Sequence, residues 1–274
     1  MSGRTPMSSS QTLKAIQSWA TDRFCSQRIV YHHVPKCGGT SISRALRRAY
    51  IPSQAGLRPE ESIKAFHAWQ RGHQTDAGHP ADLTEMMLLY LLYTDVRCIA
   101  AHAPFSNQGF EIFSDRYAFV TILRDPVERF ISNFYWNTTR PPGERRIDQP
   151  LEEFLETDAA VRLGSTYARY FCGTPANAKF STQDVDKAIV NLRQLNFVGF
   201  LDEMGEFSAA LRRLTGRRIR IGTENVLNTN SRREAILSGP LRPKVLTVCA
   251  ADREIWDAVQ DLRSARAGNV SPAS

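Results

Sequence analysis

The stretch that decides the fold is RIVYHHVPKCGGTSISRALRRAY, residues 28–50. Residues 28–34 are rich in β-branched and aromatic side chains and stop at a proline, which predicts a strand. Lys36 and two nearby glycines follow as a short turn, and Thr40 or Ser41 is placed to cap a helix. Apolar residues then recur on one face of that helix up to the next proline. The stretch therefore predicts a strand, a tight turn and a helix in direct succession.

Outside this unit, apolar runs and amphipathic segments alternate along the chain. Strands are predicted at residues 96–101, 117–123 and 197–201, and helices at residues 83–93, 151–170, 202–214 and 241–262. A loop with a short helix near 63–69 is expected at residues 52–80, and further loops at residues 139–148 and 225–233. Strands that alternate with helices predict an α/β fold of three layers, with a central, mainly parallel sheet and a P-loop-like phosphate-binding loop.

The length of the chain predicts one domain. It has 274 residues, of which 42% are hydrophobic, enough for one substantial core. We expect this domain at residues 27–263, preceded by a partly disordered leader at 1–26 and followed by a flexible tail at 264–274. The longest apolar run, residues 86–93, falls well short of the ~20 residues that cross a bilayer, so no transmembrane segment is expected.

Five scattered cysteines and a formal net charge of +7 narrow the class of protein. The cysteines form no C-x-x-C pair, which argues against a disulfide framework and a zinc site and favours a reducing, cytoplasmic location. No cluster of ligands in the sequence indicates a metal, and none is expected. The positive charge suits an anionic ligand without identifying it. No nucleic-acid-binding module accompanies that charge, so nucleic acid is not an expected partner.

The turn PKCGGTS, residues 35–41, has the composition of an anion-binding loop. Its two glycines permit a tight turn that presents backbone N–H groups, while Lys36 and the following helix N-terminus add positive charge. A Walker A loop is excluded because its lysine follows the last glycine, whereas Lys36 precedes both. A cysteine-phosphatase loop is excluded because Ser43, rather than arginine, stands six positions after Cys37. An ordinary strand-to-helix turn is the alternative.

Two segments resemble the donor-binding motifs of sulfotransferases that use 3′-phosphoadenosine-5′-phosphosulfate (PAPS). HVPKCGGTSIS, residues 33–43, resembles the loop for the 5′-phosphosulfate, and FVTILRDPVERFISNFYW, residues 119–136, resembles the segment for the 3′-phosphate. The branch most similar in pattern is the carbohydrate type, near the heparan and uronyl 2-O-sulfotransferases and their bacterial relatives. A weaker match is GSTYARYFCG, residues 164–173, in which Ser165 and Tyr167 stand where the family pattern has Asn and Gln.

The resemblance implies in-line transfer of a sulfuryl group from PAPS to a hydroxyl of a carbohydrate-like acceptor, with release of adenosine 3′,5′-bisphosphate. It implies that Lys36 is the cation at the leaving oxygen and that His102 is the general base. His102 matches the second histidine of the branch's H-G-H motif, whereas Ala100 replaces the first. The residues expected to bind the donor are Pro35, Lys36, Gly38, Gly39, Thr40, Ser41, Arg124 and Ser132. Arg169 and Arg140 are candidates for contact with the acceptor.

Other interpretations stay open at this level. A nucleotide-kinase-like phosphotransferase would share the sheet and the phosphate loop, and a non-catalytic PAPS- or anion-binding protein would share the donor site. Arg124 could instead form an ion pair with Asp125, and His32 and His33 are taken as structural residues. The acceptor could be a sugar, a lipid-linked glycan or a small metabolite, and nothing in the sequence indicates the oligomeric state.

Overall fold

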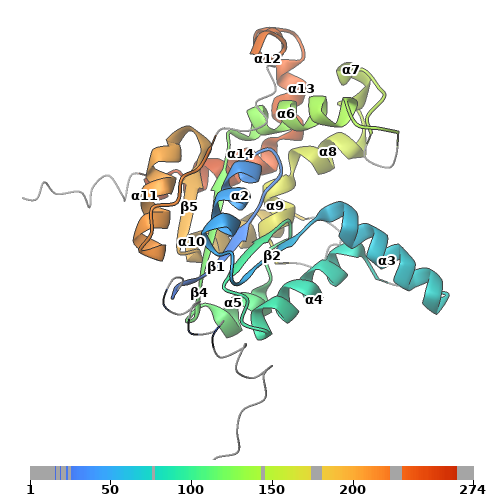
Figure 1. Cartoon of the computed structure of the whole chain (residues 1–274). Coiled ribbons are helices and arrows are strands. Elements are labelled where there is room, and N and C mark those ends of the chain that lie inside the picture. Colours follow the sequence, from blue (N-terminus) through green and yellow to red (C-terminus); the bar gives the residue numbers. More distant parts are fainter. Residues whose placement is uncertain are drawn as a thin grey trace, which may run out of the picture.

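The structure is a computed structural model that describes residues 16, 19, 23, 26–75, 78–142, 146–173, 181–222 and 230–263. Five strands form one sheet: β1 (Arg28–His32), β2 (Gln54–Leu57), β3 (Cys98–Ala101), β4 (Tyr117–Leu123) and β5 (Phe197–Phe200). Their order is β2-β3-β1-β4-β5, and every neighbouring pair is parallel. This is the central parallel sheet of the predicted α/β fold (Figure 1).

Helices connect the strands and cover the sheet. Between β1 and β4 they are α2 (Gly39–Ala49), α3 (Pro59–His73), α4 (Pro80–Tyr93) and α5 (Asn107–Phe113). Between β4 and β5 they are α6 (Pro126–Thr138), α7 (Leu151–Phe154), α8 (Asp158–Gly164), α9 (Thr166–Phe171) and α10 (Gln183–Gln194). After β5 come the 3₁₀ turn η1 (Leu201–Glu203), α11 (Met204–Thr215), α12 (Asn230–Ser238), α13 (Arg242–Val248) and α14 (Ala250–Val259). None of the described helices is long and apolar enough to cross a membrane.

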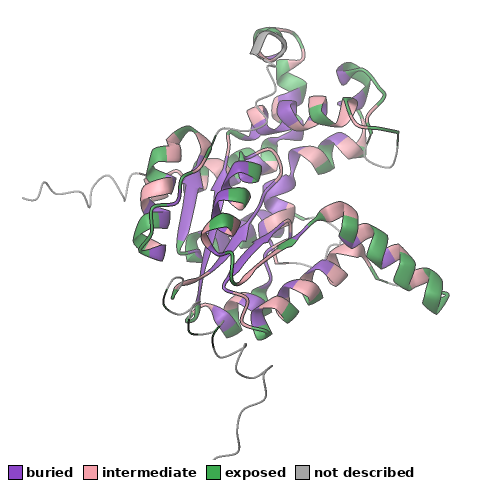
Figure 2. Ribbon diagram, in the orientation of Figure 1, coloured by how far each residue is buried: buried purple, intermediate pink, exposed green. Residues whose placement is uncertain are grey.

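The sheet lies between two helical layers because its side chains alternate between its two faces. On β1, Tyr31 points toward α11 and contacts Phe207, with ring centroids 6.3 Å apart. His32 points the opposite way and contacts Phe171 of α9, with ring centroids 6.1 Å apart, as well as Phe119 of β4. The residues of β1, β3, β4 and β5 are nearly all buried, so the main core fills both faces of the sheet (Figure 2).

A second apolar cluster holds α6, α7, α8 and α13 together. Its buried members include Phe130, Phe134, Phe154, Val245 and Val248. In Figure 1 these helices stand above the sheet, while α3 and α4 project from its lower right. The far end of α3 is exposed to solvent, as Figure 2 shows. The two groups of helices therefore flank the edge of the sheet at which β3, β1 and β4 end.

Two of the predicted segments need correction. Segment 52–80 is not mainly loop, because it contains β2 and the 15-residue helix α3. The four residues of β2 include a glycine and lack the apolar alternation by which strands are recognised. The predicted helix 241–262 is two helices that meet at Cys249. They part where Val248 packs against α8, so closely that a Cβ on Gly164 would lie 2.0 Å from the Val248 oxygen.

Other boundaries agree or differ by small amounts. The strand predicted at 117–123 matches β4 at both ends, and the helix predicted at 151–170 is divided into α7, α8 and α9. Thr157 marks the boundary between α7 and α8. Its side chain accepts a hydrogen bond from the backbone of Ala160 and so caps the N-terminus of α8. The predicted loop at 225–233 falls into two parts. Residues 225–229 lie outside the described residues, and the chain is helical from residue 230 onward.

Candidate active site

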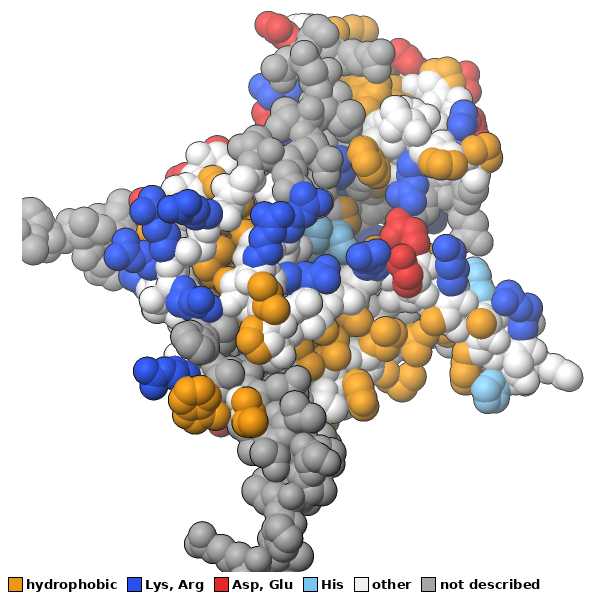
Figure 3. Space-filling model, in the orientation of Figure 1, with side chains coloured by type: hydrophobic (Ala, Val, Ile, Leu, Met, Phe, Trp, Pro, Cys, Tyr) orange, Lys and Arg blue, Asp and Glu red, His pale blue; other side chains and the backbone are white. Residues whose placement is uncertain are grey.

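A cleft of about 1370 Å³ runs along the carboxyl edge of the sheet. A residue that follows each strand lines it: His33 after β1, Pro59 after β2, His102 after β3, Arg124 after β4 and Leu201 after β5. Parallel strands bring their carboxyl ends to one edge, where the ligand sites of open α/β sheets gather. In Figure 3, Lys and Arg side chains surround a hollow between the upper helices and α3, with histidine at its base.

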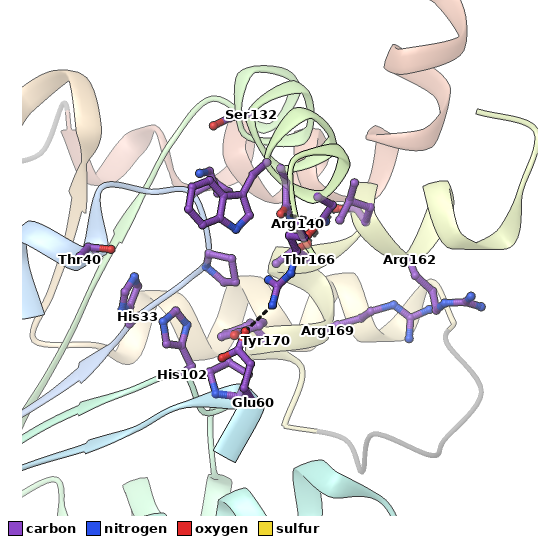
Figure 4. Close-up of a pocket in the computed structure, with 18 of the residues that line it drawn as sticks. His33, Thr40, Glu60, His102, Ser132, Arg140, Arg162, Thr166, Arg169 and Tyr170 are labelled. Carbon is purple, nitrogen blue, oxygen red and sulfur yellow. Dashed lines mark hydrogen bonds and ion pairs between the residues drawn. The ribbon is translucent and has the colours of Figure 1, made fainter. Parts of the chain in front are cut away.

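All the residues predicted to act in catalysis or binding line this one cleft. They are Pro35, Lys36, Gly38, Gly39, Thr40, Ser41, His102, Arg124, Ser132, Arg140 and Arg169. Figure 4 labels five of them, with Thr40 and Ser132 apart from Arg169. We name the part built by residues 33–41 and 124–132 the loop end. The part that includes Glu60, Arg140 and Arg169 is named the far end, and its other members used below are Arg162 and Tyr170.

The turn after β1 presents backbone N–H groups to the loop end. Lys36 and Gly38 both adopt a left-handed backbone conformation, with φ of 66° and 73°, which costs about 1–3 kcal/mol for a residue other than glycine. Gly38 is the N-cap of α2, so the predicted caps Thr40 and Ser41 lie inside the helix. Among the described residues no side chain caps α2, and its first turn carries no acidic residue. Its first N–H groups are therefore available to an anion.

His33 and His102 stack at the base of the cleft. Their ring centroids lie 3.7 Å apart and their planes meet at 31°. Figure 4 shows the two rings next to each other. The parallel register places His32 opposite Ala101, so the next residue of each segment also lies side by side. Gly39 must be a glycine here, because a Cβ would lie 2.0 Å from Cδ2 of His33.

His33 was taken as structural from the sequence, and the structure instead places it in the cleft. It is buried, and its Nδ1 lies 3.2 Å from Oγ of Ser43. Burial, together with the neighbouring His102, holds the pKa of His33 well below its ordinary value, so this ring is neutral near pH 7. The signal that could have found His33 is its position immediately after a strand and two residues before the phosphate-loop proline.

Lys36 reaches across the loop end to α6. Its Nζ lies 4.4 Å from the ring centroid of Trp136, a cation–π contact. Burial lowers the pKa of Lys36 to about 8, and the nearby positive charge of Arg124 adds to the effect. Trp136 was not singled out from the sequence as a site residue, because a lone aromatic in an amphipathic helix normally belongs to the core.

Arg124 follows β4 and is held by Glu128 rather than by its neighbour Asp125. The guanidinium lies 3.2 Å from the Glu128 carboxylate, which also pairs with Arg233 at 3.1 Å. Asp125 instead caps α6, because its carboxylate accepts a hydrogen bond of 2.9 Å from the backbone of Glu128. Ser132 lies two turns further along α6 and also lines the cleft.

The far end is lined by arginines from three segments. Arg140, after α6, pairs with Glu60 of α3 at 2.9 Å and so bridges the two sides of the cleft (Figure 4). Arg169 on α9 donates to Oγ of Ser165 at 3.2 Å. Burial and the nearby charge of Arg162 on α8 lower the pKa of Arg169. The far end therefore offers positive charge and hydrogen-bond donors to a ligand.

A comparison with protein families decides the identity of the chain. The model of a family described as the sulfotransferase family matches residues 21–239. The chain belongs to the sulfotransferase family. Its members transfer a sulfuryl group from PAPS to a hydroxyl-bearing acceptor, so this enzyme uses PAPS as its co-substrate.

Further comparisons describe how this sulfotransferase relates to known proteins. None of the curated proteins matches its sequence. Among solved structures it is similar to mouse sulfotransferase SULT7A1, in a crystal structure complexed with PAP, at 14% sequence identity. The TM-score is 0.38, and the match covers 81% of this chain and 69% of that chain.

Two residues near the phosphate loop of the sulfotransferase, His32 and Cys37, are buried in the protein interior. His32 is fully buried, its Nδ1 lies 3.2 Å from the Ala103 oxygen, and burial lowers its pKa to about 4. Cys37 is also fully buried, and burial raises the pKa of its thiol, which is the opposite of what a nucleophile needs. In the described part of the chain, no group of three or more His, Cys, Asp or Glu side chains is arranged to hold a metal ion.

Proposed function

We propose that this sulfotransferase sulfates a hydroxyl of a carbohydrate-like acceptor and releases adenosine 3′,5′-bisphosphate. The observation that carries the proposal is the extent of the cleft beyond the two stacked histidines. The whole cleft, with the loop end included, has a volume of about 1370 Å³, more than the ~300–1,000 Å³ of ordinary small-molecule pockets, so it has room for an acceptor beside the donor. The cleft lining also combines arginines with the aromatic rings of Trp136 and Tyr170. Sugars suit such a surface, because their hydroxyls take hydrogen bonds and their apolar faces stack on rings.

The loop end fits the phosphate groups of the donor. The uncapped N-terminus of α2 offers the N–H groups of Gly39 and Thr40, and Lys36 adds a positive charge. We assign these groups, with the Thr40 and Ser41 hydroxyls, to the 5′-phosphosulfate, at the turn formed by Pro35 and Gly38. We assign Arg124 and Ser132 to the 3′-phosphate, because a guanidinium binds phosphate through two charge-assisted hydrogen bonds.

In the proposed reaction, His102 takes the proton of the acceptor hydroxyl while the oxygen forms its bond to sulfur. The bond from sulfur to the phosphate oxygen breaks, and its electron pair leaves with adenosine 3′,5′-bisphosphate. Lys36 stabilises the negative charge that develops on this leaving oxygen. His33 supports the base, because a neutral ring 3.7 Å away does not repel the proton that His102 gains.

A screen of acceptors with labelled PAPS tests the proposed function. The panel contains neutral and acidic oligosaccharides, with phenols and simple alcohols as the matched non-carbohydrate set. We expect label to enter only the oligosaccharides. Label confined to phenols or simple alcohols would contradict a carbohydrate acceptor.

A thermal-shift measurement tests the donor side separately. Adenosine 3′,5′-bisphosphate is expected to raise the melting temperature without magnesium, because only the folded state binds it. ATP with magnesium is the matched control, and a larger shift with this ligand would instead favour phosphoryl transfer.

A further inference from the structure

Tyr167 on α9 lies behind the loop end and is fully buried. Its hydroxyl oxygen lies 2.9 Å from the backbone nitrogen of Arg124 and is also hydrogen-bonded to the Arg124 carbonyl oxygen. The same hydroxyl lies 3.5 Å from Sγ of Cys37, in the middle of the phosphate loop. One side chain therefore contacts both segments that build the loop end.

The hydroxyl of Tyr167 both donates to and accepts from the backbone of Arg124. Burial raises the pKa of Tyr167 well above its ordinary value, so the hydroxyl keeps its proton and can donate. It has one hydrogen to donate and two lone pairs to accept. It donates to the carbonyl oxygen of Arg124 and accepts from the Arg124 N–H, and it lies 3.5 Å from Sγ of Cys37, a contact in which either atom could be the donor. Both backbone polar groups of Arg124 are thus held by one atom, where the chain leaves β4.

Tyr167 is itself fixed by a buried ion pair. Asp252 of α14 accepts hydrogen bonds from the backbone nitrogens of Tyr167, at 2.8 Å, and Ala168, at 3.1 Å. Arg129 of α6 pairs with Asp252 at 3.2 Å, and its guanidinium carbon lies 5.2 Å from the centre of the Tyr167 ring. Asp252 and Arg129 are both completely buried. The backbone and the ring of Tyr167 are therefore held in place by residues of α14 and α6.

We propose that Tyr167 is a positioning residue that aims Arg124 at the 3′-phosphate of the donor through its two hydrogen bonds to the Arg124 backbone. Tyr167 in this way sets the preference for donors that carry a 3′-phosphate. The inference rests on the proposed assignment of Arg124 to that phosphate. It concerns a position at which Tyr stands where the pattern that this segment resembles has Gln.

Tyr167→Phe tests the inference, because it removes the hydroxyl and keeps the ring. Calorimetry measures the Kd of two ligands, adenosine 3′,5′-bisphosphate and adenosine 5′-phosphosulfate, which lacks the 3′-phosphate. We expect binding of the bisphosphate to weaken about tenfold and binding of the phosphosulfate to change less than about threefold, since a single well-placed hydrogen bond is lost. The KM for PAPS should rise, while the KM for the acceptor stays unchanged.

Tyr31→Phe is the matched control. Tyr31 is equally buried, and its hydroxyl has no hydrogen-bond partner among the described residues. Both Kd values should stay at those of the parent protein. If Tyr167→Phe leaves the ratio of the two Kd values unchanged, either because both weaken equally or because neither changes, the proposed positioning role is wrong.

Cys37→Ala keeps the inference testable if Tyr167→Phe does not fold. It removes the contact of Tyr167 with the loop and leaves both contacts with Arg124, so the ratio of the two Kd values should be preserved. A ratio that falls about tenfold would show that the selectivity runs through the loop, against the inference. The proposed function fails in a separate way, if the parent protein itself does not prefer the ligand with the 3′-phosphate.

Discussion

The loop end and the far end of the cleft are built in different ways. The loop end consists of two short segments, residues 33–41 and 124–132, and each runs from the end of a strand into the first turns of a helix. The far end collects Glu60, Arg140 and Arg169 from α3, from the turn after α6 and from α9. An anion is bound by consecutive N–H groups and one or two cations, which one turn can supply. A larger acceptor needs side chains from several helices, so its site leaves no local pattern.

The largest effect is expected for His102→Ala, which lies where the two ends meet. Loss of a general base slows transfer by about 10²–10⁴-fold. Binding of adenosine 3′,5′-bisphosphate should stay within a few-fold of the parent, because the proposed base acts on the acceptor and not on the donor. Turnover with labelled PAPS and calorimetry measure the two quantities.

The matched controls for His102→Ala are two other histidines. His73→Ala changes an exposed residue on α3 and should leave turnover unaltered. His33→Ala removes the stacked partner and should reduce turnover less than His102→Ala does. A His33→Ala protein that is inactive, beside a normal His102→Ala protein, would show that the base had been misassigned.

Lys36→Ala is expected to slow transfer by about 10²–10³-fold, the usual loss when one group that stabilises developing charge is removed. Its pKa of about 8 also predicts a pH dependence. The ammonium is charged below that pKa and loses its proton as the pH rises through about 8, so kcat/KM should fall there. Lys36→Arg keeps the charge and should move this alkaline limb to higher pH. A limb in the same place in both proteins would exclude Lys36 as its source.

Arg124→Ala is expected to act only at the loop end. It should weaken adenosine 3′,5′-bisphosphate by about 1.5–3 kcal/mol, the contribution of a charge-assisted hydrogen bond. Adenosine 5′-phosphosulfate should lose much less affinity in the same calorimetric experiment. Equal losses for the two ligands would place Arg124 away from the 3′-phosphate.

The smallest effect is expected for Arg140→Ala, at the far end. It removes a partly exposed ion pair with Glu60, worth at most about 1 kcal/mol. We expect the KM for the acceptor to rise by up to about fivefold, with no change in the KM for PAPS. Arg116→Ala is the control, because its 2.9 Å pair with Asp95 precedes β4, at the opposite edge of the sheet. A rise in the PAPS KM alone would move Arg140 to the donor side.

Much of the fold could be predicted from the sequence, and the exceptions have physical reasons. The apolar run of β4 was predicted at both ends, because a central strand buried on both faces contains little else. β2 was missed, since a short strand with a glycine has no periodic pattern of its own. It becomes a strand because Gln54–Leu57 pairs in parallel with β3.

The residues of the candidate site also divide into those that the sequence predicted and those that it missed. The residues that face the phosphate loop were predicted, because the motif and the strand-to-helix turn are contiguous. His33 was not, because its role depends on a neighbour in another strand. Glu60 and Trp136 were missed for the same reason, since their contacts with Arg140 and Lys36 join segments far apart in the chain.

The sequence by itself determined the strand–turn–helix unit of the phosphate loop, the alternation of strands and helices, and part of the set of residues that line the cleft. These features depend on neighbouring residues, whose conformations and hydrogen bonds are set over a few positions of chain. Only the tertiary structure decided that His33 stacks on His102 and that the hydroxyl of Tyr167 holds Arg124 and Cys37. Such contacts depend on the register of the strands and on the packing of α9 against the sheet, which no single segment encodes.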